Sequence, residues 1–235
     1  MEPLTQTYDA IGGKYGGKSV KPAFPFVIFD MDGTLVDSFG LIAESYDFAI
    51  GRLENHVKDS RINVTQGRTL EEALGERVPE SEVPVAVERF HGYYEKHCSS
   101  VNVFPGIRPL LMALQRRGVE LAVFTGQTRR ATDVTLRETD LRKFFSKVVT
   151  ANDVAEPKPS PEGLKLAMEG IGAVPEGTVY VGDDPDDVNA SRSAGVTGAA
   201  ALWGSIRREE LVALQPDFLF NRPGELKLLS TWTIR

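Results

Sequence analysis

Two aspartates near the start of the chain have the type and spacing to do chemistry. The apolar run 26–29 (FVIF) leads directly into residues 30–34 (DMDGT), so Asp30 and Asp32 stand two residues apart beside a segment that favours burial. Two like charges about 4 Å apart repel by roughly 4 kcal/mol at an effective dielectric constant near 20. The pair therefore needs a counter-charge, and carboxylates held in this way can act as nucleophiles, as general acids and bases or as metal ligands.

Residues with chemically useful groups also follow three more apolar runs. Thr125 and Gly126 follow VELAVF, Lys158 lies in the loop AEPKPSPEG, and Asp183 and Asp187 belong to GDDPDD. Each of these taken alone is typical of a turn, a helix cap or a solvated lysine. Because the carboxyl ends of parallel strands meet at one edge of a sheet, their recurrence at successive strand ends favours a functional site.

The pattern around these residues predicts an α/β protein. Short apolar runs rich in β-branched residues alternate with amphipathic stretches of helical period, which predicts βαβ units and a doubly wound, mostly parallel sheet covered by helices on both faces. The expected strands are 24–29, 119–124, 147–150, 178–181, 198–202 and, weakly, 217–220. The expected helices are 106–117, 127–138, 160–171 (with Ser160 as cap and Pro161 as first residue), 185–194, 206–213 and 223–229.

Residues 38–103 interrupt this alternation. They show helical patterns at 39–53, 69–75 and 82–97 and no convincing strand. The simplest account is an all-helical domain inserted after the first strand, with 23–37 and 104–235 as the α/β core. Residues 1–22 contain four glycines and few apolar residues, so we expect a flexible arm. Asp37 is then expected to lie on the route into the insertion and to take no part in catalysis.

Composition bounds the class of protein. The chain of 235 residues is 41% hydrophobic and 26% charged, which is typical of a soluble globular protein. No run reaches the roughly 18 apolar residues of a membrane span, and the start lacks the pattern of a signal peptide. A single cysteine, Cys98, excludes an intrachain disulfide, so we expect a cytoplasmic protein. The net charge of -6 argues against general nucleic-acid binding, and no feature indicates an oligomeric state.

A hard divalent cation would offset the clustered carboxylates. Oxygen ligands of this kind suit Mg²⁺, which also retains several waters. One lysine, Lys158, cannot neutralise four carboxylates, but it could stabilise an anion bound beside the metal. The pattern therefore favours Mg²⁺ together with a dianionic substrate, for which a phosphorylated small metabolite is the first candidate.

In order and spacing, these residues resemble the haloacid dehalogenase-like superfamily of phosphotransferases. Its first motif, Asp-x-Asp-Gly-Thr, is matched by residues 30–34, its second by Thr125, its third by Lys158 and its fourth, Gly-Asp-x-x-x-Asp, by residues 182–187. The resemblance extends from residue 24 to about residue 230. The insertion at 38–103 corresponds to the helical cap of the subclass that includes phosphoglycolate phosphatases.

The resemblance implies a magnesium-dependent phosphatase for a small phosphomonoester. Asp30 would attack phosphorus and form an aspartyl-phosphate, while Asp32 would protonate the leaving alcohol and then activate water. The residues implied to hold the metal are Asp30, Asp32 through its carbonyl, Asp183, and Asp187 as ligand or support. Those implied to hold the transferring phosphoryl group are Thr125, Gly126 and Lys158.

The segment 63–74 (NVTQGRTLEEAL) resembles the part of the cap that faces the active site. Arg68 is therefore a candidate to bind a substrate carboxylate or a second phosphate through its planar fork of donors. The alternative is a solvated arginine near a helix start. Cap movement would have to admit substrate and exclude water, so the linkers near Asp37–Gly40 and Val101–Gly106 are expected to act as hinges.

Other functions remain open at this point. The same scaffold supports phosphomutases and pyrophosphatases. A non-catalytic binding or regulatory protein would be expected to have lost Asp30, Asp32 or Lys158, and all three are present. Residues 12–19 (GGKYGGKS) satisfy the pattern of a nucleotide-binding P-loop, but no convincing strand precedes them and two prolines follow, which favours a glycine-rich arm.

Overall fold

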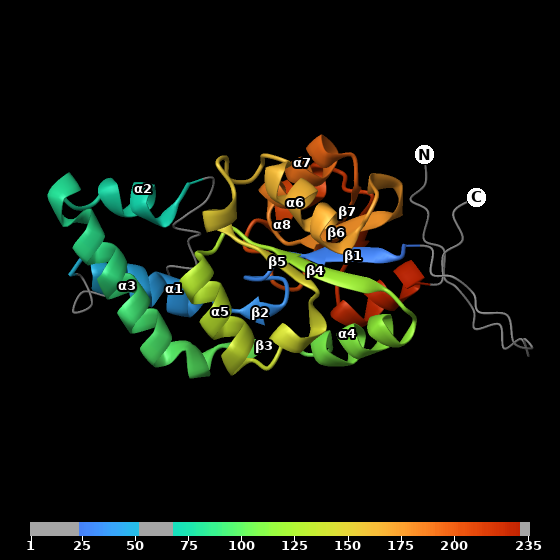
Figure 1. The fold of residues 1–235 in the computed structure, drawn as a ribbon, viewed down its shortest axis with the longest axis horizontal. Coiled ribbons are helices and arrows are strands. Elements are labelled where there is room, and N and C mark those ends of the chain that lie inside the picture. The colour runs from blue at the N-terminus through green and yellow to red at the C-terminus, as the bar shows by residue number, and fades with distance from the viewer. Residues whose placement is uncertain (1–23, 52–67, 231–235) are drawn as a thin grey trace, which may run out of the picture.

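A six-stranded parallel sheet forms the centre of the molecule (Figure 1). The computed structural model describes residues 24–51 and 68–230, so the predicted arm 1–22, the P-loop-like residues 12–19 and residues 63–67 of the cap segment lie outside the described residues. Every neighbouring pair of strands in the sheet is parallel. In spatial order the strands are β5 (Lys147–Val149), β4 (Glu120–Phe124), β1 (Phe26–Phe29), β6 (Thr178–Gly182), β7 (Thr197–Ala201) and β8 (Phe218–Phe220).

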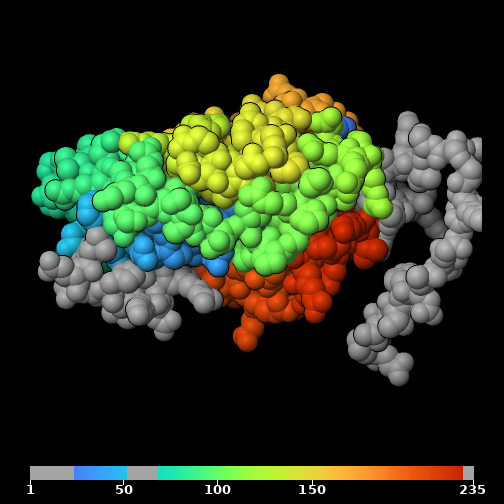
Figure 2. Space-filling view, turned by 90° about the horizontal axis from the view of Figure 1, so that it is seen from below, coloured from blue at the N-terminus to red at the C-terminus, as the bar shows by residue number. Residues whose placement is uncertain are grey.

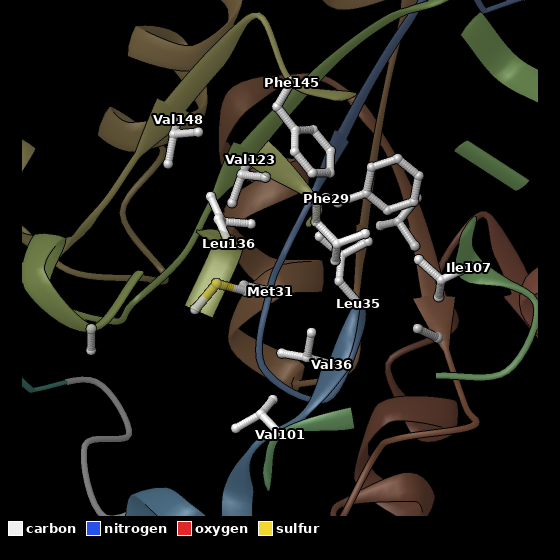
Figure 3. Packing of buried hydrophobic residues seen from close by; sticks show 14 of the residues in the cluster. Phe29, Met31, Leu35, Val36, Val101, Ile107, Val123, Leu136, Phe145 and Val148 are labelled. Atoms are coloured by element: carbon white, nitrogen blue, oxygen red, sulfur yellow. The ribbon is translucent and has the colours of Figure 1, made fainter. Parts of the chain in front are cut away.

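Helices cover both faces of the sheet. Alternate residues of β1 point to opposite faces, so Val27 and Phe29 join one apolar cluster and Ile28 joins another. Figure 3 shows the first cluster, in which Phe29 packs with residues such as Leu136 and Phe145. The elements on that face are α4 (Ile107–Arg116), α5 (Arg129–Glu138) and the 3₁₀ segment η7 (Pro223–Ser230). Those on the other face are α6 (Glu162–Ile171) and α7 (Pro185–Ala194), with α8 (Arg208–Ala213) packed beside α7.

The described part of the insertion, between β2 and β3, contains three α-helices. They are α1 (Phe39–Ala49), α2 (Leu70–Gly75) and α3 (Val83–His97), with short 3₁₀ turns η2 (Glu80–Glu82) and η3 (Cys98–Ser100). Figure 1 shows these inserted helices at one end of the molecule, beyond the carboxyl ends of the strands. Both α1 and α2 pack against α3, and α3 also packs against α5 of the α/β part. In the space-filling view of Figure 2 the green surface of the inserted helices adjoins that of the α/β part.

A short ribbon joins the insertion to the sheet domain. Strands β2 (Val36–Asp37) and β3 (Asn102–Val103) pair antiparallel, with Val36 opposite Val103. The expectation of no strand within 38–103 is therefore wrong at its last two residues, because a two-residue strand is too short to show an alternating pattern. The helix α1 begins at Phe39, so Gly40, expected in a linker, is helical.

The predicted fold class is confirmed: an α/β protein with a doubly wound parallel sheet and an inserted helical segment. Predicted strands and α/β-domain helices begin and end within two residues of those observed. The predicted cap of α6 is shifted, since its N-cap is Pro161 and the helix begins at Glu162. The hydroxyl of Ser160 still accepts the amide N–H of Glu162, at 3.3 Å. None of the helices in the described residues combines the length and the apolar character that a membrane span requires.

The remaining 3₁₀ turns are short connections. They are η4 (Arg142–Phe144), η5 (Ala151–Asp153) and η6 (Pro175–Gly177). Cys98 is buried in η3, with its sulfur 3.6 Å from the hydroxyl of Thr135 on α5.

Candidate active site

A pocket of about 80 Å³ lies where β1, β4 and β6 end. All the residues predicted from the sequence to belong to a site line it: Asp30, Asp32, Arg68, Thr125, Gly126, Lys158, Asp183 and Asp187. The fold thus brings together groups that are up to 157 positions apart in the chain, from residue 30 to residue 187. Phe39 and Ile42 of α1 also line the pocket, so the inserted helices form part of its wall.

Three buried carboxylates converge in this pocket. Oxygens of Asp30, Asp183 and Asp187 all lie within 4.8 Å of one another, and each residue is 7% exposed or less. Asp30 follows β1 directly. Its amide N–H donates a hydrogen bond to the carbonyl oxygen of Val181, at 2.8 Å, which extends the β1–β6 pairing into the site. Asp183 follows β6, and Asp187 lies in the first turn of α7.

The DMDGT turn is shaped to meet Asp183. The hydroxyl of Thr34 donates a hydrogen bond to Asp183 Oδ1, at 2.8 Å. Gly33 has φ +79°, and a Cβ there would lie 2.2 Å from Asp183 Oδ2. Only glycine permits both this backbone conformation and this close approach.

Lys158 is the cation of the cluster. Its Nζ lies 2.7 Å from Asp30 Oδ1 and 2.8 Å from Asp187 Oδ1, and its side chain is 11% exposed. The loop after β5 carries this lysine back across the sheet edge to the acids that follow β1 and β6. The ammonium also lies 5.0 Å from the ring centroid of Phe124, within the range of a cation–π contact.

Both oxygens of Asp187 already accept hydrogen bonds within the protein. Oδ1 accepts from Lys158 and from the hydroxyl of Tyr180, each at 2.8 Å. Oδ2 accepts the amide N–H of Asp184, at 3.0 Å, as part of the capping box of α7. A Cβ at Gly182 would lie 2.2 Å from Asp187 Oδ2, so the glycine before the aspartates makes room for this arrangement.

Among the residues that the structure describes, protein groups alone do not balance the charges of this cluster. Burial raises the pKa of Asp30 to about 8; Lys158 opposes the rise, whereas Asp187 and Asp32 add to it. Burial, then Asp30 and Asp187, raise the pKa of Asp183 well above its usual value. Burial would lower the pKa of Lys158, but the carboxylates of Asp187 and Asp30 outweigh it and raise that pKa. One ammonium therefore does not offset three carboxylates, and their oxygens fit a hard divalent cation.

Asp32 has different surroundings from Asp30. Its Oδ1 accepts the hydroxyl of Ser38, just before α1. Burial raises its pKa, while the hydrogen bond from Ser38, the charge of Lys158 and the hydroxyl of Thr125 oppose the rise. A half-buried carboxyl with a raised pKa that lines the pocket is suited to hold a proton and to transfer it.

The loop after β4 adds a hydroxyl and backbone amides to the lining of the pocket. The hydroxyl of Thr125 accepts the amide N–H of Gln127, at 3.1 Å, which tightens the loop around the exposed Gly126. The side-chain oxygen of Gln127 accepts the amide N–H of Thr128, at 3.0 Å, and Thr128 caps α5. Hydroxyls and backbone amides at a helix start are suited to holding an anion.

Arg68 reaches the pocket from the start of α2. Its guanidinium forms an ion pair with Glu76, at 2.6 Å, and its side chain is 38% exposed. The following residue, Thr69, caps α2 together with Glu72. Arg68 therefore has features of both alternatives: it lines the pocket, and it is partly exposed to solvent at the start of a helix.

Sequence reasoning missed three hydroxyls that contact the predicted carboxylates. Thr34 was recognised only as part of a motif, and Ser38 only as the start of the insertion. Tyr180 lies in a strand that was recognised by its apolar pattern. The one signal for a role of Tyr180 is its phenolic hydroxyl within the otherwise apolar core of the run TVYVG.

Comparison with known proteins identifies the family. The sequence profile of the haloacid dehalogenase-like hydrolases matches residues 27–201. Pyrophosphatase PpaX of Oceanobacillus iheyensis is 29% identical over 196 residues, 83% of this chain and 91% of that protein. A Dickeya dadantii protein named "Probable phosphatase IndB" is 32% identical over 210 residues, 86% of this chain and 91% of that protein.

Solved structures agree on the fold. A Lactobacillus plantarum protein assigned as a phosphoglycolate phosphatase has a TM-score of 0.75 at 21% identity, covering 88% of this chain and 99% of that one. The chain belongs to the haloacid dehalogenase-like hydrolase family and is an enzyme of the hydrolase class. The resemblance inferred from its motifs is thereby confirmed.

Proposed function

We propose that this protein is a magnesium-dependent phosphatase that hydrolyses a small phosphomonoester through an aspartyl-phosphate on Asp30. The observation that carries the proposal is the pairing of two carboxylates with different surroundings. Asp30 is bonded to Lys158 within the acidic cluster, whereas Asp32 is bonded to Ser38 beside it. A nucleophile and a proton donor are the two roles that this chemistry requires.

The first half of the reaction forms a bond from Asp30 to phosphorus. A carboxylate oxygen of Asp30 attacks, the bond from phosphorus to the leaving oxygen breaks, and Asp32 gives its proton to the departing alkoxide. In the second half Asp32, now ionised, takes a proton from water, which attacks phosphorus and releases Asp30. Lys158, Thr125 and the amide of Gly126 hold the phosphoryl oxygens during both transfers.

The donor set fits Mg²⁺. The residues that would hold it are Asp30 and Asp183 through their carboxylates and Asp32 through its carbonyl. When bound, Mg²⁺ supplies positive charge that keeps the carboxylates ionised and offsets charge on the phosphoryl oxygens. Asp187 accepts three hydrogen bonds from protein donors, so we assign it the support of Lys158, with the remaining lone pair of Oδ2 left to contact the metal.

We further propose that the inserted helices act as a cap, as part of a division into core 23–37 and 104–235 and cap 38–103. Phe39 and Ile42 would cover the substrate, and Arg68 would bind a second anionic group on it. The β2–β3 ribbon would serve as the hinge. Crystals with and without orthovanadate test this: an unchanged orientation of the inserted helices in both would contradict a moving cap.

Inorganic pyrophosphate is a second candidate substrate. The support is the naming of a relative with 29% identity as a pyrophosphatase. The same residues would act, with phosphate in place of an alcohol as the leaving group and Arg68 on the leaving phosphate.

A substrate panel distinguishes the candidates. Phosphate release from purified protein should be measured with small phosphomonoesters, phosphoglycolate among them, and with pyrophosphate, each with Mg²⁺ and with EDTA. We expect Mg²⁺-dependent release from at least one compound and loss of release in Asp30→Asn. The absence of turnover across the panel would reject the phosphatase assignment, and a strong preference for pyrophosphate would favour the second candidate.

A further inference from the structure

The hydroxyl of Tyr180 lies against the acidic cluster. Tyr180 is the middle residue of β6 and is 1% exposed. Its hydroxyl oxygen lies 2.8 Å from Oδ1 of Asp187 and 3.1 Å from the carbonyl oxygen of Phe124. A hydroxyl has one proton to donate, and a carboxylate accepts it more strongly than a neutral carbonyl does. The proton therefore goes mainly to Asp187.

The surroundings of the Tyr180 ring are apolar. It packs in the cluster between the sheet and the helices α6 and α7, with Ile28, Phe124, Leu164 and Met168. A phenylalanine ring would fill the same space without introducing a polar atom. A buried hydroxyl costs free energy unless it is hydrogen-bonded. The hydrogen bond to the carboxylate of Asp187 offsets this cost for Tyr180.

Asp187 in turn holds Lys158. The Oδ1 atom that accepts the Tyr180 hydroxyl also accepts the Lys158 ammonium, at 2.8 Å. The ammonium lies 5.5 Å from the centroid of the Tyr180 ring. Tyr180 thus contacts this ion pair twice, with its hydroxyl on the carboxylate and with its ring on the ammonium.

We infer that Tyr180 is a positioning residue whose hydroxyl fixes the carboxylate of Asp187 and, through it, the ammonium of Lys158. The inference rests on the proposed function, in which Lys158 holds the transferring phosphoryl oxygens. Tyr180 acts through these partners, because it does not itself line the pocket.

The first test removes only the hydroxyl. Tyr180→Phe should be compared with Thr178→Val, which deletes another buried hydroxyl of β6, one that donates to the carbonyl oxygen of Val174 at 2.7 Å at the opposite end of the strand from the pocket. With p-nitrophenyl phosphate and Mg²⁺, we expect kcat of Tyr180→Phe to fall about tenfold or more while KM changes by less than about twofold. Thr178→Val should keep kcat, and the two variants should lose similar thermal stability. Unchanged kcat in Tyr180→Phe would overturn the inference.

A double-mutant cycle separates positioning from a general structural role. If the hydroxyl acts through Asp187, then Tyr180→Phe should lower kcat little further once Asp187→Asn is present. A purely structural role predicts the same fold-loss from Tyr180→Phe in both backgrounds. That additive result would also overturn the inference.

The outcomes distinguish this inference from the proposed function. If the wild-type protein releases no phosphate from any compound of the panel, the proposed function fails. Crystal structures of wild-type protein and Tyr180→Phe then decide the inference: displaced Asp187 and Lys158 side chains support it, and unchanged positions reject it. Tyr180→Met serves as a second hydroxyl-free variant if Tyr180→Phe does not fold.

Discussion

Asp30 and Asp32 stand two residues apart and meet different partners. Asp30 faces Lys158 and two further carboxylates, whereas Asp32 faces the hydroxyl of Ser38. The chain turns back directly after β1, with the amide N–H of Leu35 donating to the carbonyl oxygen of Met31 at 2.8 Å, and in this turn one carboxylate of the DMD segment meets Lys158 while the other meets Ser38. The difference in surroundings, and not in residue type, is what would separate a nucleophile from a proton donor.

The effect on the rate of removing the acid function of Asp32 should depend on the leaving group of the substrate. In Asp32→Asn, steady-state turnover of an alkyl phosphate should fall by about 10²- to 10⁴-fold, because the alkoxide leaves without a proton. With p-nitrophenyl phosphate, whose leaving group needs no proton, the variant should still release a rapid burst of nitrophenolate before the slow second step. Asp133→Asn, at an exposed position of α5 away from the pocket, is the control and should keep wild-type rates. Equal losses in the burst and in alkyl phosphate turnover would contradict the assignment.

Arg68 should matter only for substrates that carry a second anionic group. A charge-assisted hydrogen bond contributes about 1.5–3 kcal/mol, so Arg68→Ala should lower kcat/KM for such a substrate by roughly 10- to 100-fold. The same variant should change p-nitrophenyl phosphate hydrolysis little. Arg77→Ala provides a matched control, since Arg77 is exposed after α2 and does not line the pocket. An equal loss of kcat/KM on both substrates in Arg68→Ala would contradict the assignment of Arg68 to a second anionic group.

At the scale of elements, close packing of α6 on β4 supports the lysine. A Cβ at Gly163 would lie 2.0 Å from the Phe124 ring, and that ring lies under the Lys158 ammonium. Gly163→Ala should therefore destabilise the protein by roughly 1–3 kcal/mol through overpacking and should also reduce kcat. Gly40→Ala is the matched control, because Gly40 is in α1 with open space around its Cα and should gain up to about 1 kcal/mol. Urea unfolding measures the free energy of unfolding of both variants. An unchanged free energy of unfolding in Gly163→Ala would contradict the close packing described.

Some elements were predictable from the sequence and others were not. The strands β1, β4 and β6 are apolar runs that end abruptly in Asp, Thr or Gly, so their ends and the residues beyond them could be located. The strands β2 and β3 are two residues long, which leaves no period to recognise. The strand order depends on pairing between distant segments, which no local pattern records.

The same limit applies within the site. Carboxylates and Lys158 were identifiable because their types and spacing form a motif. The hydroxyl of Tyr180 belongs to a residue that strand patterns treat as apolar, and its partner Asp187 is reached only because β6 leads into α7. Residues that act through another side chain carry no spacing signal of their own.

At the scale of the whole molecule, metal binding and stability should be linked through pH. Burial raises the pKa of Asp30 from 3.8 to about 8, so the metal-free folded protein holds a proton that the unfolded chain has lost between these values. Its stability should therefore fall as pH rises from about 4 towards 8, and Asp183 acts in the same direction.

Mg²⁺ should reverse this loss, because it binds the ionised carboxylates of the folded state. We expect the rise in Tm on replacing EDTA with Mg²⁺ to be larger at pH 8 than at pH 5. Asp30→Asn should reduce both the pH dependence and the Mg²⁺ effect. An equal Mg²⁺ shift at both pH values would contradict the assignment of Asp30 to the metal.

The covalent intermediate is the central claim, and chemical trapping tests it most directly. Protein turning over substrate with Mg²⁺ is quenched and reduced with borohydride, which converts an aspartyl-phosphate into homoserine, and peptides are then sequenced by mass spectrometry. We expect homoserine at position 30, dependent on both substrate and Mg²⁺, and at no other aspartate. Full turnover by Asp30→Asn, or active wild-type protein with no modification at Asp30, would contradict the account.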